Sequence, residues 1–342
     1  MIAGSNILVT GGAGSVGRTL VRRLLDMDAN VVRIFDNSEP DLAALQSQLD
    51  DERCRFLAGD IRDRHRLKRA IQNIDIVVHS AAMKHVDISE YNPFEAVKTN
   101  VMGLQNVVDA AIDSSVERLV FTSSDKAVNP ANTMGTTKLL GEKLVTAGNK
   151  YAGRADLSLA SVRFGNVIDS SQSVVPLFRR QIAEGGPVAL TDNRMTRFFL
   201  TADEMCDLVV GALRNTNGGE VFLYQMAAMR IEHLAEVMIE ELAPEYGYDP
   251  DAINIRHVGR RAGETLHEEV VTEREADRAL EDGQLYAIPP ESTEANGYLT
   301  HDGLQGFDPT ESLVSSSANA EYLEKDEIAS LLNRAGALQV SS

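Results

Sequence analysis

Short apolar runs alternate with longer amphipathic segments along the first half of the chain. The runs have the length typical of strands and fall at residues 6–10, 31–35, 55–57, 74–78, 119–122 and 157–162. Between them, apolar residues recur every three or four positions, most clearly at 16–25, 93–112 and 138–145, which predicts helices. Strands that alternate with helices form parallel βαβ units. The pattern therefore predicts an α/β fold built on a doubly wound parallel sheet.

The pattern becomes less regular beyond about residue 163. We expect a short strand at 188–190 and helices at 202–213, 231–242 and 325–334, separated by longer loops. Residues 292–319 are rich in Ser, Gly, Asn and Thr, which predicts an exposed and partly mobile stretch. We accordingly divide the chain into a domain of residues 1–165 and a smaller portion of residues 166–342, partly interleaved with the end of the sheet.

A glycine-rich turn follows the first expected strand, with Gly11, Gly12, Gly14 and Gly17 placed before a predicted helix. Glycines at such a turn let the backbone approach a pyrophosphate, whose charge then lies at the helix N-terminus. Asp36 ends the next strand, about 20 residues beyond the last glycine, where a carboxylate can bond the adenine ribose hydroxyls. This context predicts a dinucleotide-binding site.

The same acidic residue bears on the choice of cofactor. Asp36 would repel a 2′-phosphate and so favours NAD, whereas Arg18 and Arg33 are close enough in sequence to keep NADP as an alternative. Small or polar residues after the later strands are expected to complete the site. The predicted cofactor-binding residues are Gly11, Gly14, Ser15, Val16, Gly17, Asp36, Asp60, Ile61, Ala81, Ala82, Asn100, Lys138 and Val167.

Polar side chains that can carry chemistry follow the fifth expected strand. Ser124, Asp125 and Lys126 come at its carboxyl end, where open α/β sheets bind their ligands, and Lys138 follows in the next helix. Ser124 with Met134-x-x-x-Lys138 has the layout of the short-chain dehydrogenase/reductase signature, except that methionine replaces tyrosine. A thioether neither donates nor accepts a proton at neutral pH. Proton chemistry is therefore expected from Asp125 and Lys126.

Taken together, these motifs resemble the CapD-like polysaccharide biosynthesis family, the UDP-N-acetylglucosamine 4,6-dehydratases of the extended short-chain dehydrogenase/reductase superfamily. The resemblance covers nearly the whole chain. It is carried by residues 81–86, 124–130, 134–138, 163–167, 173–176, 195–199 and 263–268. It implies a Rossmann domain that binds NAD(P) in residues 1–165 and a portion that binds the UDP-sugar in residues 166–342. Some members with methionine at the tyrosine place are active dehydratases.

The resemblance also implies roles for individual residues. Lys126 matches the base that removes the C5 proton, and Asp125 matches the acid that helps water leave from C6. A basic amine must be neutral, so we expect burial or another cation, for which Lys138 is a candidate, to depress the pKa of Lys126. Ser124 can bond the 4-oxygen of the sugar. The acceptor of the 4-hydroxyl proton is left open between a water relay and Lys138.

Substrate contacts are expected where this chain matches the family. These residues are Lys84, Asn166, Arg197, Arg261 and Glu264, with the arginines suited to a diphosphate. The family pattern Arg-Pro-Gly-Glu occurs here as Arg-Ala-Gly-Glu at residues 261–264. A UDP-sugar 4-epimerase remains an alternative enzyme, and a non-catalytic NAD-binding regulator remains an alternative of another class. The configuration produced at C5 stays open.

Composition limits the partners and the setting. The net charge of −18 over 342 residues argues against a nucleic-acid partner, because phosphate binding needs a basic face. Lysine is absent between Lys150 and Lys325, whereas acidic residues are spread along the chain. We interpret this as a surface adapted to high salt, with an ordinary acidic enzyme as the alternative. The superfamily resemblance favours a homo-oligomer.

Apolar runs and cysteines give further expectations. No run approaches the roughly 18 to 20 residues of a membrane span, and no basic region followed by an apolar stretch opens the chain, which predicts a cytoplasmic protein. Cys54 and Cys206 belong to no ligand pattern. We therefore predict neither a disulfide nor a metal site.

Overall fold

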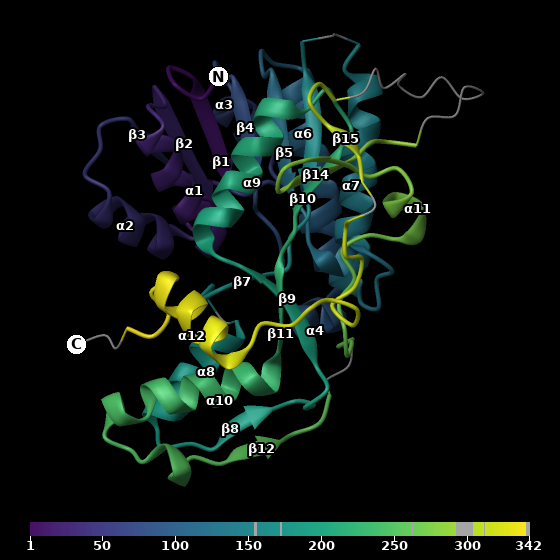
Figure 1. The fold of residues 1–342 in the computed structure, drawn as a ribbon. Coiled ribbons are helices and arrows are strands. Elements are labelled where there is room, and N and C mark those ends of the chain that lie inside the picture. The colour runs from purple at the N-terminus through teal and green to yellow at the C-terminus, as the bar shows by residue number, and fades with distance from the viewer. Residues whose placement is uncertain (154–155, 172, 261–262, 292–303, 311, 340–342) are drawn as a thin grey trace.

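A ten-stranded sheet forms the centre of the protein (Figure 1). The computed structural model describes residues 1–153, 156–171, 173–260, 263–291, 304–310 and 312–339. The strands lie in the order β15-β13-β14-β10-β6-β5-β4-β1-β2-β3. Their bounds are β1 Asn6–Thr10, β2 Val31–Asp36, β3 Cys54–Ala58, β4 Ile76–His79, β5 Arg118–Thr122, β6 Ser158–Val162, β10 Val221–Tyr224, β13 Leu280–Asp282, β14 Leu285–Ile288 and β15 Asp308–Pro309.

Seven neighbouring strands of the sheet are parallel, namely β10, β6, β5, β4, β1, β2 and β3, which confirms the predicted α/β fold. The order 3-2-1-4-5-6 places a topological switch point between β1 and β4, where ligands of such sheets bind. Three antiparallel strands, β14, β13 and β15, extend the sheet beyond β10. The sequence pattern did not predict this edge, because the three strands are only two to four residues long.

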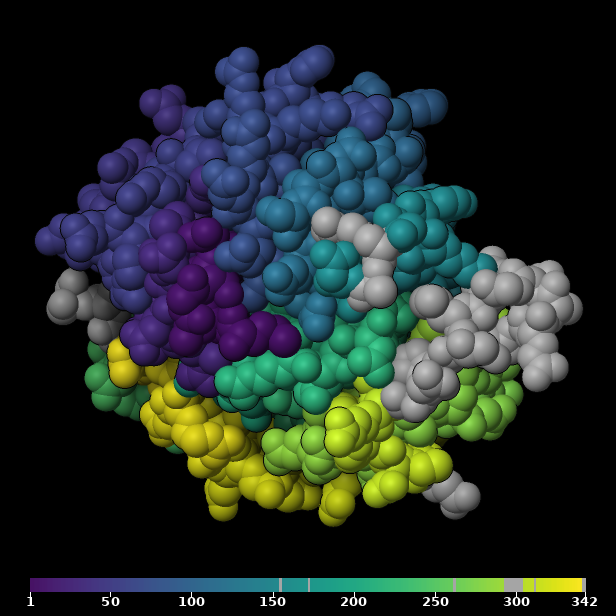
Figure 2. Space-filling view, turned by 90° about the horizontal axis from the view of Figure 1, so that it is seen from above, coloured from purple at the N-terminus to yellow at the C-terminus, as the bar shows by residue number. Residues whose placement is uncertain are grey.

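Helices cover both faces of the sheet. Helices α1 Ser15–Asp26, α2 Glu39–Gln48 and α9 Ala202–Asn215 bury their apolar residues on one face. Helices α3 Arg64–Ala70, α6 Leu104–Ile112 and α7 Thr133–Tyr151 bury theirs on the other. In Figure 2 the purple N-terminal residues lie beside the teal-green residues of α9, and Arg23 of α1 pairs there with Asp207. A segment from the second half of the chain thus completes the first layer.

The predicted helix 93–112 is present, but its middle is wound differently. It consists of α5 Pro93–Ala96, the π-helical segment η1 Val97–Gly103 and α6, and it follows the short helix α4 Val86–Tyr91. Helix α7 is longer than predicted, because Asn132 caps it by accepting a hydrogen bond from the Gly135 N–H at 2.8 Å. The cap therefore fixes the start of the helix that carries Met134 and Lys138.

A second apolar core lies below the main sheet in Figure 1. It is built from the helices α8 Val174–Ala183, α10 Ile231–Leu242 and α12 Lys325–Arg334, with strands β8 Val188–Leu190, β9 Thr196–Leu200, β11 Ala227–Arg230 and β12 Ile255–His257. Strand β7 Asn166–Val167 pairs with β9, but Val167 belongs to the core of the main sheet. The one-turn elements are η2 Asp125–Ala127, η3 Pro244–Tyr246, η4 Pro250–Ala252 and α11 Glu273–Ala276. The predicted helices at 202–213, 231–242 and 325–334 are confirmed. The division of the chain at residue 165 stays a prediction.

Part of the stretch 292–319 differs from the expectation of an exposed loop. Residues 292–303 and 311 lie outside the described residues, and the remaining residues include both exposed and buried positions. Leu304, Phe307 and Ser317 are buried, and Ser317 joins the site described below. The expectation of exposure is therefore wrong for these three residues, and a polar side chain such as that of Ser317 is buried because its polar groups find partners.

Cys54 and Cys206 are buried and unpaired. Among the described residues, no helix combines the length and the apolar character needed to cross a bilayer.

Candidate active site

A cleft of about 760 Å³ opens at the switch point between β1 and β4. The glycine-rich turn forms one wall. A Cβ on Gly17 would lie 2.1 Å from the Gly11 carbonyl oxygen, and Gly11 has φ +66° with the Ala81 amide nitrogen 2.6 Å from a Cβ position. Only glycine fits such close backbone approaches. The turn therefore brings the N-terminus of α1 to the cleft, as a pyrophosphate site requires.

Asp36 lies at the end of β2 and lines the cleft. Its two carboxylate oxygens accept 3.0 Å hydrogen bonds from the Ala13 and Ser38 N–H groups. Each oxygen keeps acceptor capacity for a ribose hydroxyl. Arg33 instead donates to the Ala70 and Gln72 carbonyls, and Arg18 donates to the Ala13 carbonyl. The two arginines are thus engaged by the protein backbone, and the residues present fit a dinucleotide without a 2′-phosphate.

Most of the predicted cofactor residues line this cleft. They are Gly11, Gly14, Ser15, Val16, Gly17, Asp36, Asp60, Ile61, Ala81, Ala82, Lys138 and Val167. Asn100 does not line it. Its side chain is buried in η1, where it accepts from the Met83 N–H at 2.7 Å and donates to the Met83 carbonyl and Thr137 Oγ1 at 2.9 Å. Asn100 therefore holds the loop after β4 against α7 and acts on the cleft through that loop.

Lys138 enters the cleft from α7 beside Met134. Its Nζ donates to the Thr122 carbonyl at 2.7 Å and lies 4.7 Å from the centre of the Phe121 ring. Burial lowers the pKa of Lys138 to about 8, although Glu142, one turn further along α7, opposes this shift. Burial and the Lys138 charge lower the pKa of His79 to about 3, so this ring is neutral. Lys138 therefore loses its proton more readily than an exposed lysine.

Glu142 belongs to a buried ion pair behind Lys138. Arg163, at the end of β6, donates to Glu142 at 2.7 Å and to Glu275 of α11 at 3.1 Å, and Ser123 Oγ donates to Glu142 at 2.5 Å. These contacts join β5, β6, α7 and α11, so they fix the wall that carries Lys138 and the adjoining Ser124.

The Asp125 carboxylate lies beneath the cleft, and its two oxygens differ. Oδ1 accepts from Ser124 Oγ at 2.8 Å, from the Lys126 N–H at 2.8 Å and from Lys126 Nζ at 3.0 Å. Oδ2 is buried and has no hydrogen-bond partner within the described part of the chain. A carboxyl group in this position can carry a proton on Oδ2 without losing the contacts of Oδ1. Asp125 and Lys126 are thus a carboxyl group and an amine held in direct contact.

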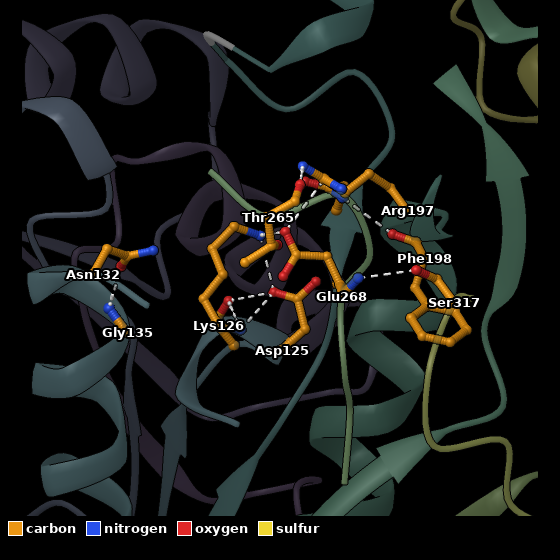
Figure 3. Close-up of polar contacts among 12 residues, drawn as sticks. Asp125, Lys126, Asn132, Gly135, Arg197, Phe198, Thr265, Glu268 and Ser317 are labelled. Carbon is orange, nitrogen blue, oxygen red and sulfur yellow. Dashed lines mark hydrogen bonds and ion pairs between the residues drawn. The ribbon is translucent and has the colours of Figure 1, made fainter. Parts of the chain in front are cut away.

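A third charged pair completes the surroundings of Lys126 (Figure 3). Glu268 Oε1 lies 3.5 Å from Lys126 Nζ and 3.2 Å from Arg197 Nε. The sequence motif 263–268 contains Glu268, but no role was predicted for it, because only folding brings it to Lys126. The predicted depression of the pKa of Lys126 is wrong. Burial lowers this pKa, but Asp125 and Glu268 outweigh burial and hold it above its ordinary value.

Arg197, and not the expected Lys138, is the cation that opposes this rise in the pKa of Lys126. Its Nη1 donates to the Thr196 and Leu266 carbonyls at 2.8 and 3.0 Å, and its Nη2 donates to the Thr265 carbonyl at 2.8 Å and contacts Met195 Sδ at 3.6 Å. With Nε on Glu268, its donors point to protein atoms. Binding a diphosphate would require Arg197 to break these contacts.

The other predicted substrate residues lie around the far end of the cleft. A smaller cavity of about 210 Å³ adjoins Lys126 and is lined by Asn132, Asn166, Arg197, Gly263, Glu264 and Glu268, among others. Lys84 lines the main cleft, where its Nζ donates to the Ser171 carbonyl at 3.1 Å, and burial lowers its pKa. Arg261 lies outside the described residues. Asn166 and Lys126 line both cavities, so the two spaces meet at these two side chains.

The fold and this cleft define an α/β protein of the extended short-chain dehydrogenase/reductase class. The family model described as "Polysaccharide biosynthesis protein" matches residues 7–290, and the chain belongs to this family. This membership confirms the predicted family resemblance.

Curated relatives cover most of the chain. It is 44% identical over 326 residues to "Uncharacterized membrane protein MJ1061" of Methanocaldococcus jannaschii, covering 95% of this chain and 94% of that one. It is 39% identical over 294 residues to "UDP-N-acetylglucosamine 4,6-dehydratase (inverting)" of Campylobacter jejuni, covering 85% and 84%. It is 34% identical over 300 residues to "UDP-glucose 4-epimerase" of Rickettsia akari, covering 86% of each.

Solved structures agree with the fold. Pen from Bacillus thuringiensis is 37% identical with a TM-score of 0.89, covering 99% of this chain and 100% of that one. DesIV, a dTDP-glucose 4,6-dehydratase from Streptomyces venezuelae with NAD and TYD bound, is 27% identical with a TM-score of 0.67, covering 76% and 86%.

Proposed function

We propose that this protein is an NAD-dependent 4,6-dehydratase that converts UDP-N-acetylglucosamine to a UDP-4-keto-6-deoxyhexosamine for surface glycan synthesis. The observation that carries the proposal is the Asp125–Lys126 pair at the end of the cleft, with Asp125 Oδ2 unpartnered among the described residues. The names of the Campylobacter and Streptomyces proteins, both 4,6-dehydratases, support the reaction, and the family description supports the setting.

NAD fits the residues of the cleft. Asp36 keeps acceptor capacity for ribose hydroxyls, the α1 N-terminus favours a pyrophosphate, and Lys138 lies where a nicotinamide ribose would be held. Bound NAD supplies a transient oxidation at C4 and returns the same reducing equivalent at C6, so no cofactor is consumed. The solved relative with bound NAD supports the choice of cofactor.

Asp125 and Lys126 supply both halves of the elimination. The neutral Lys126 amine takes the C5 proton, which the 4-keto group has made acidic, and Asp125 gives a proton to the departing C6 hydroxyl. The charged pair, a Lys126 ammonium with an Asp125 carboxylate, holds the same number of protons as the reactive pair, a neutral Lys126 amine with a protonated Asp125 carboxyl group. One proton transfer from Lys126 Nζ to Asp125 Oδ1 across their 3.0 Å hydrogen bond therefore gives the neutral amine and the protonated carboxyl group together.

Lys138 is our choice for the acceptor of the 4-hydroxyl proton, directly or through a water. Its pKa of about 8 places an appreciable neutral fraction within reach of neutral pH, and Met134 beside it cannot perform this step. Ser124 is assigned to the 4-oxygen. Lys84, Asn166 and Glu264 are assigned to the nucleotide-sugar, because they line the two joined cavities. We propose the same assignment for Arg261.

A UDP-sugar 4-epimerase is the second candidate, and the similarity to the Rickettsia protein favours it. An epimerase needs the oxidation at C4 but no acid and base at C5 and C6. It would leave the buried Asp125–Lys126 pair without a role.

One experiment separates the candidates. The purified protein is incubated with UDP-N-acetylglucosamine and NAD in D₂O, and the sugar is followed by NMR. We expect a 4-keto-6-deoxy product with deuterium at C5, whose configuration assigns retention or inversion. UDP-N-acetylgalactosamine without C5 deuterium would support the epimerase, and unchanged substrate with NAD bound would support a regulator.

We also propose a homo-oligomer. Exposed apolar side chains follow one another at Ile88, Tyr91, Phe94 and Val97 along α4 to η1, with Tyr91 and Phe94 88% and 81% exposed. Such a stripe favours contact with a second copy. Analytical ultracentrifugation measures the expected mass, and a monomer at micromolar concentration would contradict it.

A further inference from the structure

The carboxylate of Glu268 lies between two cations that enter from different elements. Lys126 comes from η2 and Arg197 from β9, and both approach Oε1 of Glu268 (Figure 3). Glu268 is only 6% exposed, so water does little to screen these charges. The dehydratase steps derived above use Lys126 but leave Glu268 without a task.

Backbone contacts fix Glu268 in this place. Its N–H donates to Ser317 Oγ at 2.9 Å, and its carbonyl accepts from the Ser317 N–H at 2.9 Å. Arg197 donates to the carbonyls of Thr265 and Leu266 in the same segment. Ser317 and Arg197, from two distant parts of the chain, therefore hold the backbone around Glu268, and Arg197 Nε also holds its carboxylate at 3.2 Å, independently of Lys126.

The charges around Lys126 balance. The groups that shift its pKa are Asp125 from η2, Glu268 from the 263–268 segment and Arg197 from β9, and Glu264 lines the adjoining cavity. Two carboxylates favour the ammonium form, whereas burial and Arg197 favour the neutral amine. Burial raises the pKa of Glu268, and Lys126 and Arg197 work against that rise.

During elimination the negative charge of Asp125 beside Lys126 is lost. When Asp125 carries the proton for the C6 hydroxyl, it no longer attracts Lys126 as an anion. Glu268 is then the remaining carboxylate beside the amine, and Arg197 on the same oxygen favours its ionised form. A lysine side chain has four rotatable bonds, so it needs a second fixed contact to stay directed at C5.

We propose that Glu268 is a positioning residue for Lys126, and that Glu268 and Arg197 together set the pH range in which this amine is neutral. The inference rests on the proposed dehydratase function for the meaning of that pH range. It assigns to Arg197 a role in tuning Lys126, in place of the diphosphate contact expected from the sequence.

Two substitutions should shift the pKa of Lys126 in opposite directions. Glu268→Gln removes an anion and should lower the pKa of Lys126 by about one pH unit or more, whereas Arg197→Gln removes a cation and should raise it. Glu269→Gln is the matched control, because Glu269 is the next residue in the chain and bonds Asn129 instead. A merely structural role would lower activity in both variants without opposite shifts.

The pKa of Lys126 is measured in two ways on the full-length protein. The first is the pH dependence of C5 deuterium exchange with UDP-N-acetylglucosamine and NAD. The second is the pH dependence of acylation of the Lys126 amine by acetic anhydride, followed by mass spectrometry of its peptide, which requires no turnover. If wild type exchanges no deuterium, the proposed function fails, and the acylation rates still test the inference.

The expected result is a lower Lys126 pKa in Glu268→Gln, a higher one in Arg197→Gln and no change in Glu269→Gln. Glu268→Asp, which keeps the charge but shortens the side chain, should keep the wild-type pKa and lose exchange rate through poorer positioning. If Arg197→Gln does not fold, the two Glu268 variants carry the test. An unchanged Lys126 pKa in Glu268→Gln would overturn the inference.

Discussion

Lys126 and Lys138 line the same cleft, but their surroundings shift their pKa values in opposite directions. Lys126 ends between the carboxylates of Asp125 and Glu268. Lys138 ends on a backbone carbonyl and an aromatic ring, and the carboxylate that acts on its charge, Glu142, is one helical turn away. Burial acts on both amines, so the difference comes from the anions within reach.

This difference bears on how the two amines would share one reaction. Lys138 can be neutral near pH 8 without help, which suits a group that accepts a proton early in the cycle. Lys126 needs a partner that takes its proton, and Asp125 at 3.0 Å is suited to do so. The comparison predicts that the two lysines respond differently to substitution, to pH and to salt.

Replacing Lys126 should have the largest effect on activity. Lys126→Met removes the proposed base, and we expect C5 deuterium exchange to fall by roughly 10²- to 10⁴-fold, the range typical of general acid-base catalysis. Binding of NAD, measured by calorimetry, should be unchanged. Lys143→Met, which alters an exposed lysine on α7, is the control. Exchange at the wild-type rate in Lys126→Met would remove Lys126 from the mechanism.

Replacing Lys138 should change the pH dependence of stability. Its pKa is about 8 in the folded protein and 10.5 in an ordinary setting, so the unfolded chain binds more protons between these values. Stability therefore rises with pH across this window, and below pH 8 the charged amine costs the fold on the order of 3 kcal/mol. Lys138→Met should raise the free energy of unfolding at pH 7 and remove this part of the rise.

Urea unfolding of the protein without cofactor, at pH 7 to 10.5, measures both effects. Lys143→Met should keep the wild-type pH dependence, because its side chain is exposed. Equal slopes for Lys138→Met and wild type between pH 8 and 10.5 would contradict the environment described for Lys138.

Added salt should affect the exposed charges of the surface and change the buried contacts of Lys126 little. Screening by molar KCl reduces repulsion among exposed carboxylates, so we expect the melting temperature to rise by several degrees as KCl is added. The pH dependence of C5 exchange should move little, because Asp125 and Glu268 are buried beside Lys126. A melting temperature indifferent to KCl would remove the interpretation of a high-salt surface.

Features that depend on neighbours in the chain could be predicted from the amino-acid sequence. Apolar periodicity identified the six parallel strands from β1 to β6, and the glycine turn with Asp36 identified the cleft, because each of these patterns spans a single βαβ unit. Asp125 and Lys126 are adjacent in sequence, so their proximity could be predicted as well. The long helices α9, α10 and α12 followed from their strong 3.6-residue periodicity.

The surroundings of those residues became clear from the folded chain alone. It placed Asn100 behind the loop after β4, turned the donors of Arg197 toward carbonyls and brought Glu268 to Lys126. It also reversed the expected shift in the pKa of Lys126. The placement of these three side chains depends on segments far apart in the chain meeting in a buried space, which the periodicity of the sequence does not indicate. The shift in the pKa of Lys126 depends on Glu268 from such a segment and also on the contact that its amine makes with the neighbouring Asp125.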